Sequence, residues 1–102
     1  MRLNAREKDT LKREIVDCLR TEEEVRKIVI FGSFLSSDDP HDLDIAVFQD
    51  STAPYLPLAM KYRRKTRSVA QRIPLDILPL KSQISDDPFL AEVARGEVVY
   101  ES

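Results

Sequence analysis

A chain of 102 residues with 42% apolar residues is long enough for one folded domain and leaves no room for a second, so we expect a single domain over residues 1–102. A net charge of -2 disfavours a protein that binds nucleic acid with its whole surface. No apolar run is long enough to cross a bilayer, and the polar amino terminus is unlike a secretory signal, so we expect a cytoplasmic protein without membrane contact.

The first elements are a helix and a buried strand. Apolar side chains recur at helical spacing from Asn4 to about Arg20, and Asn4 followed by Glu7 resembles a capping box. The β-branched run Val25–Phe31 predicts a strand that stops at a tight turn on Gly32.

Two further strands flank a second helix. The alternation over Asp42–Phe48 predicts a strand. A stripe of apolar residues that reaches Ile73 predicts a helix beginning near Pro57, where proline suits the first turn. Two prolines bracket Leu75–Leu78, which predicts a short third strand.

The carboxyl-terminal part has clear helix boundaries. Asp87 is predicted as the N-cap, Pro88 as the first helical residue, and Gly96 as the glycine just past the helix end. An extended segment, Val98–Tyr100, follows. This order of elements, with short polar connections, predicts an α/β fold in which helices pack on a small mixed β-sheet.

Gly32 and Ser33 form the first candidate site. The chain has only two glycines, and Gly32 ends an apolar strand. A Gly-Ser turn followed by one helical turn can present N–H groups and a hydroxyl to phosphate, although an ordinary tight turn has the same sequence.

Three aspartates form the second candidate site. Asp42 and Asp44 project from the same face of a strand, and two adjacent carboxylates repel unless a cation compensates them. Asp76 lies within the third strand, where carboxylates are poor strand formers. Oxygen-only ligands near phosphate favour Mg²⁺ or Mn²⁺ over zinc. An alternative explanation of Asp42 and Asp44 is an edge strand that uses their charge to block aggregation.

These motifs together resemble a known superfamily. The segments IVIFGSFLSSDDPHDLDIAVF and PLDILPL are similar to the G-S, D-x-D and distal D signature of nucleotidyltransferases related to DNA polymerase β, above all to the minimal nucleotidyltransferase (MNT) group. FLAEVARGEVVYE resembles the closing helix, glycine and strand of that group. The resemblance implies the nucleotidyltransferase fold over most of the chain.

The resemblance also implies roles for the candidate residues. Gly32 and Ser33 would hold the triphosphate, Asp42 and Asp44 the metal ions, and Asp76 a metal ion or the acceptor hydroxyl. The implied activity is transfer of a nucleoside monophosphate, most simply AMP from ATP, to a hydroxyl on another molecule. Small members of the group are often antitoxins of helical HEPN ribonuclease toxins, and some attach AMP to a toxin tyrosine, so the implied partner is a HEPN-type protein.

One departure from the family pattern leaves an alternative open. The group commonly has a basic residue after Gly-Ser, where this chain has Leu35, Ser36 and Ser37. Loss of a cationic phosphate contact favours an antitoxin that only binds its partner, unless the basic run from Lys61 to Arg67, or Lys81, compensates.

Other kinds of site are disfavoured by the residue counts. The single cysteine, Cys18, falls on the apolar face of the first helix and is predicted to be a core thiol. The single histidine, His41, lies in a polar loop, so neither a zinc site nor a Cys-His nucleophile can be assembled. A nucleic-acid-binding domain that uses the helix from Lys61 to Arg72 is the weaker third possibility.

Overall fold

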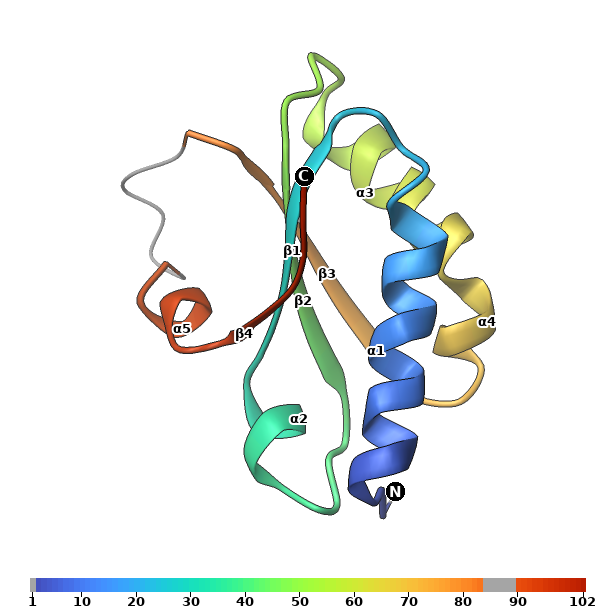
Figure 1. Cartoon of the computed structure of the whole chain (residues 1–102). Coiled ribbons are helices and arrows are strands. Elements are labelled where there is room, and N and C mark those ends of the chain that lie inside the picture. Colours follow the sequence, from blue (N-terminus) through green and yellow to red (C-terminus); the bar gives the residue numbers. More distant parts are fainter. Residues whose placement is uncertain (1, 84–89) are drawn as a thin grey trace.

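A four-stranded sheet carries helices on both faces in the computed structural model, which describes residues 2–83 and 90–102 (Figure 1). The strands are β1 (Val25–Phe31), β2 (Leu43–Gln49), β3 (Leu75–Lys81) and β4 (Glu97–Glu101). The helices are α1 (Ala5–Leu19), α2 (Ser33–Ser36), α3 (Tyr55–Lys65), α4 (Arg67–Ala70) and α5 (Leu90–Ala94). The predicted α/β fold with a small mixed sheet is confirmed. Within the described ranges, no helix combines the length and apolar character needed to cross a membrane.

The strand order β3-β2-β1-β4 explains how distant residues meet. β1 pairs antiparallel with both β2 and β4, whereas β2 and β3 are parallel. A parallel pair needs a crossover connection, which α3 and α4 supply. The β2–β3 ladder pairs Asp44 directly with Asp76, so the two side chains lie at the same level on the same face.

Helix α1 begins as the sequence predicts. The Asn4 side chain accepts a hydrogen bond from the Glu7 N–H at 2.8 Å, and the Asn4 N–H donates to Glu7 Oε1 at 3.0 Å. This reciprocal pair satisfies two N–H groups that would otherwise have no acceptor. Cys18, near the helix end, is half-buried and packs against the core.

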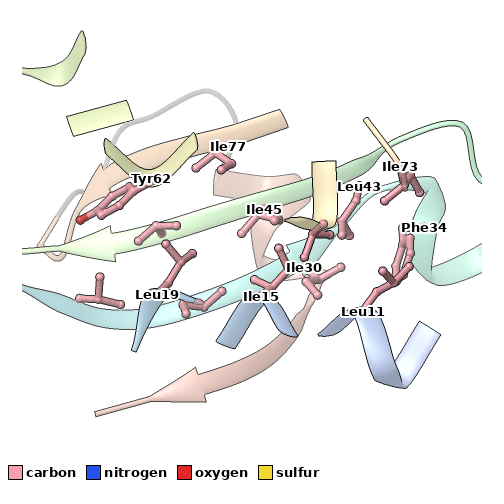
Figure 2. Packing of buried hydrophobic residues seen from close by; sticks show 14 of the residues in the cluster. Leu11, Ile15, Leu19, Ile30, Phe34, Leu43, Ile45, Tyr62, Ile73 and Ile77 are labelled. Carbon is pink, nitrogen blue, oxygen red and sulfur yellow. The ribbon is translucent and has the colours of Figure 1, made fainter. Parts of the chain in front are cut away.

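The core has two parts, one on each face of the sheet. The larger lies between the sheet and α1, α3 and α4, where Ile15, Ile30 and Ile45 are fully buried (Figure 2). The smaller lies under α5 and consists of Val29, Phe31, Ala46, Phe48, Leu80 and Val93. Figure 1 shows α5 against only part of its face of the sheet.

The second predicted helix is two helices in the structure. It begins earlier than expected, at Tyr55, so that Pro57 falls within the first turn, where its missing N–H leaves no acceptor unpaired. Thr66 separates α3 from α4, and its hydroxyl donates to the Tyr62 carbonyl at 2.8 Å. The Thr66 N–H also donates to that carbonyl at 3.1 Å, and the break coincides with the non-helical backbone of Thr66, whose φ is -105° and ψ is 16°.

Two strand boundaries also differ from prediction. β2 begins at Leu43, one residue later than expected. β3 continues through Pro79 to Lys81, whereas the sequence predicts only Leu75–Leu78. The proline is tolerated because β3 lies at the edge of the sheet, where its missing N–H interrupts no ladder on the outer side.

The last helix and strand are as predicted in type. The expected N-cap Asp87 and first helical residue Pro88 lie outside the described residues. Gly96 follows α5, but its backbone is not in the left-handed region expected of a helix-ending glycine. Glycine is required there instead because a Cβ would come within 2.8 Å of Val29 Cγ1 on β1. The predicted extended segment after it is the edge strand β4.

Candidate active site

The Gly32 turn lies directly against Asp44. β1 ends at Phe31, which pairs with Asp44 across the antiparallel β1–β2 ladder. Gly32 has a φ of +80°, a left-handed conformation that other residues rarely adopt, and a Cβ there would overlap with the Asp44 carboxylate. Glycine is therefore required both for its backbone conformation and for the close approach of a carboxylate.

The three predicted aspartates converge at one end of the sheet. Asp42 immediately precedes β2, while Asp44 and Asp76 are the second residues of β2 and β3. One oxygen from each carboxylate lies within 4.8 Å of the others. Asp42 and Asp44 are half-buried and Asp76 is exposed. Since Asp44 shares a strand face with Ala46, the cluster lies on the α5 side of the sheet.

The cluster is electrostatically unfavourable in the protein alone. Burial raises the pKa of Asp44 to about 6, with smaller contributions from the charges of Asp42 and Asp76 and from a hydrogen bond with Asp76. The charge of Glu92, on α5, raises it further. A divalent cation would remove this repulsion, and carboxylate oxygens are the ligands that magnesium and manganese prefer.

Glu92 is a residue that sequence reasoning missed. It lies on a helix that follows β3 in the chain, yet its charge reaches Asp44 because α5 packs on the same face of the sheet. Nothing in its local pattern distinguishes it from a solvent-facing helical glutamate. Only the tertiary placement of α5 reveals a fourth carboxylate near the site.

A second contact missed from the sequence holds the turn after Gly32. Ser33 begins α2 and is exposed, whereas Phe34 is fully buried and anchors the turn in the core. Lys8 on α1 donates from Nζ to the carbonyl of Ser37 at 2.5 Å and lies 5.5 Å from the centre of the Phe34 ring. A positive charge at the carboxyl end of a helix is favourable, so Lys8 stabilises the position of α2.

The span of the chain that carries the Gly-Ser turn and the three aspartates matches a protein family. The family described as Polymerase beta, Nucleotidyltransferase matches residues 13–102. The chain belongs to this nucleotidyltransferase family. The resemblance inferred from the sequence motifs is thereby confirmed, and the match covers every candidate site residue.

Solved structures share the nucleotidyltransferase fold of this chain at low identity. A chain in the complex of tri-AMPylated Shewanella oneidensis HEPN toxin with MNT antitoxin is 21% identical, with a TM-score of 0.70 over 93% of this chain and 73% of its own. A chain of the toxin–antitoxin MntA–HepT is 20% identical, with a TM-score of 0.67 over 92% of this chain and 73% of its own. A chain of a toxin–antitoxin with AMP-PNP is 21% identical, with a TM-score of 0.69 over 89% of this chain and 73% of its own. No protein of curated function matches the sequence.

The basic residues expected to compensate for the missing cation lie elsewhere. A nucleotidyltransferase handles a highly charged triphosphate, so cations near the turn matter. Lys61 instead bonds to Glu22 at 2.9 Å and to Glu24 at 3.0 Å, just before β1 and therefore at the opposite end of the sheet. Lys65 also pairs with Glu22, and Lys81 donates to the Ser51 carbonyl beyond the end of β2. The hypothesis that these lysines serve the site is therefore wrong.

Proposed function

We propose that this nucleotidyltransferase transfers AMP from ATP to a hydroxyl of a protein partner and uses Mg²⁺ or Mn²⁺. The observation that carries the proposal is the in-register pairing of Asp44 with Asp76, beside a glycine that admits no side chain. Gly32 and Ser33 would bind the triphosphate, and Asp42, Asp44 and Asp76 would bind the metal. The protein would act in the cytoplasm as the antitoxin of a HEPN-type helical toxin.

The donor set fits a hard divalent cation. The three ligand oxygens come from carboxylates, two of them on adjacent strands, within 4.8 Å of one another. Burial, and then the charges of Asp42 and Asp76, raise the pKa of Asp44, so its charged form is unfavourable in the protein alone. When bound, the cation supplies positive charge to the triphosphate oxygens and the leaving group.

The exposure of the aspartates supports a division of roles. In the transfer, the acceptor oxygen bonds to the α-phosphorus, the bond from that phosphorus to its bridging oxygen breaks, and pyrophosphate leaves with the electron pair. Asp76 is the most exposed of the three carboxylates and thus the most accessible to an acceptor. It would take the acceptor's proton, while the more buried Asp44 serves the metal.

The partner is proposed from the solved relatives. One is a complex of an AMPylated HEPN toxin with its MNT antitoxin, and another is a toxin–antitoxin with AMP-PNP. These relatives support ATP as the donor and a hydroxyl, most simply a tyrosine, of a HEPN-type protein as the acceptor. A second candidate function, inhibition of such a partner by binding without transfer, is favoured by Ser36, which stands where the family commonly carries a basic residue.

Intact-mass measurement distinguishes the two functions. The product of the adjacent gene, which we expect to be a HEPN-type protein, is incubated with ATP, Mg²⁺ and the parent protein, Asp44→Asn, Asp76→Asn, or the matched control Asp17→Asn, whose carboxylate is exposed on α1. We expect the parent and the control to add AMP and both site variants to lose transfer. Asp76→Asn should retain more ATP binding than Asp44→Asn, because a group used mainly in the transition state affects turnover selectively.

The same experiment identifies the outcome that rejects catalysis. If the parent adds no AMP, and the parent and both site variants inhibit the partner equally, inhibition needs no chemistry. The binding-only antitoxin is then the correct reading. Transfer by Asp44→Asn at the parent's rate would reject the metal role of this carboxylate.

A further inference from the structure

The outward face of α3 has an unusual composition for a solvent-facing helix. The inward side chains Leu58, Ala59 and Tyr62 are buried in the core. At 100° per residue, the opposite side presents Leu56 and Met60 in the first turns, then Arg63 and Arg64. Arg67, the first residue of α4, is also exposed. We call Leu56, Met60, Arg63, Arg64 and Arg67 the α3 face.

The first half of the α3 face is apolar and uncovered. Leu56 is 61% exposed and Met60 is 49% exposed, and they lie one helical turn apart. Single exposed apolar residues are common and need no explanation. Two on one stripe, followed directly by arginines, have the composition of a protein interface, where methionine and arginine are enriched.

The second half of the α3 face is cationic and unpaired within the described residues. Arg63, Arg64 and Arg67 are exposed and make no ion pair with any carboxylate of residues 2–83 and 90–102. By contrast, the neighbouring Lys61 and Lys65 both pair with Glu22.

A structural role for these charges explains only part of the pattern. Arg63 and Arg64 lie in the last turn of α3, where positive charge interacts favourably with the helix dipole. Arg67 is the first residue of α4, where the same effect is unfavourable. Helix stability therefore gives no reason for an arginine at that position.

We propose that the α3 face is the docking surface for the protein partner, whose matching surface carries apolar side chains beside carboxylates. Its apolar side chains would cover Leu56 and Met60, and its carboxylates would form bidentate pairs with the arginines. A protein is favoured over nucleic acid because phosphate contacts leave the two apolar residues without a role. The inference rests on the proposed function only in taking a protein as the partner.

The position of this surface separates docking from chemistry. α3 and α4 lie on the opposite face of the sheet from α5 (Figure 1). The aspartate cluster lies on the α5 face, because Asp44 and Ala46 share a strand face. Substitutions on the α3 face should therefore alter partner affinity without altering nucleotide binding.

Two double variants test the surface from its two halves. Arg63→Glu with Arg64→Glu reverses the charge, and Leu56→Ser with Met60→Ser removes the apolar part. The matched control is Arg6→Glu with Arg13→Glu, which makes the same charge change on exposed residues of α1. Binding of the adjacent gene's product, the expected HEPN-type partner, is measured by titration calorimetry, and Mg²⁺-dependent ATP binding is measured separately. Circular dichroism checks that each variant is folded.

We expect both α3-face variants to raise the Kd for the partner on the order of 10- to 100-fold, while the control binds like the parent. ATP binding should be unchanged in all of them. If docking depends on the α3 face but no AMP is transferred, the docking surface stands and the proposed chemistry fails.

Three results would overturn the proposal. The first is a partner that does not bind the parent, or that binds parent and variants equally. The second is binding of a 20-nucleotide RNA that falls steeply with salt and depends on the two arginines, with partner binding unaffected. The third is self-association of the parent that is lost in the apolar variant, again with partner binding unaffected.

Discussion

Replacement of Asp44 by asparagine should stabilise the metal-free domain. The pKa of Asp44 lies at about 6, against 3.8 for an unperturbed aspartate, chiefly because of burial and then because of the neighbouring aspartates. The difference corresponds to about 3 kcal/mol at most. Because Asp44 is only half-buried, water screens part of the repulsion, and we expect about 1 to 2 kcal/mol.

The pH dependence of this gain follows from the direction of the pKa change. Folding favours the protonated carboxyl, so the stability due to protonation is fully present below about pH 4 and is lost as the pH rises through about 6. Asparagine mimics the neutral form at every pH. The advantage of Asp44→Asn should therefore be complete at pH 7.5 and fall to about half at pH 5.

Urea denaturation in EDTA measures this effect directly. The parent, Asp44→Asn and the surface control Asp17→Asn are compared at pH 7.5 and pH 5, and the control should change the free energy of unfolding by less than about 0.5 kcal/mol. Added Mg²⁺ should stabilise the parent and should stabilise Asp44→Asn much less, because the cation binds only the folded state. A variant less stable than the parent in EDTA at pH 7.5, or a gain equal at both pH values, would refute the reasoning.

Three other substitutions have distinct expected outcomes. Gly32→Ala should lower the free energy of unfolding by about 1 to 3 kcal/mol and abolish ATP binding, because the added Cβ would meet the Asp44 carboxylate at a strained backbone position. Urea denaturation measures the first effect and ATP titration the second. Unchanged ATP affinity would contradict the prediction. Lys8→Met should raise the Kd for ATP severalfold, because it removes the hydrogen bond to the Ser37 carbonyl, whereas Lys8→Arg should keep the parent's Kd. Equal Kd values for the two variants in an ATP titration would exclude this positioning role. Tyr62→Phe removes a hydrogen bond to Glu24 and should cost about 1 to 2 kcal/mol in urea denaturation with no change in ATP binding; a loss of ATP binding would show that the two ends of the sheet are coupled.

Local chemistry made much of this fold predictable. The Asn4–Glu7 capping box and the run Val25–Phe31 depend on interactions between near neighbours in sequence, which a pattern reveals directly. The aspartate cluster was predictable for a different reason, because residue types that are unfavourable in strands indicate a shared ligand. The structure brings those carboxylates together, and their roles in catalysis and metal binding stay predictions.

The features that the sequence could not reveal depend on tertiary contacts. The break between α3 and α4 occurs at Thr66, whose hydroxyl bonds to a backbone carbonyl. The length of β3 depends on Pro79 lying at a sheet edge. Lys8 and Glu92 approach the site from helices far from it in sequence. The sequence could not decide whether Lys61 or Lys65 compensates for the missing cation, because a charge pattern carries no information about which end of the sheet it reaches.

The parallel pairing of β2 with β3 means that the aspartate cluster is completed only after the α3–α4 crossover has folded. During synthesis, β1 and β2 can form a hairpin that already places Gly32 beside Asp44. Asp76 joins them only after the α3–α4 crossover has emerged and folded. A nascent, truncated or misfolded chain therefore has no complete cluster of carboxylates. Under the proposed function, metal affinity would therefore measure whether the α3–α4 crossover has folded.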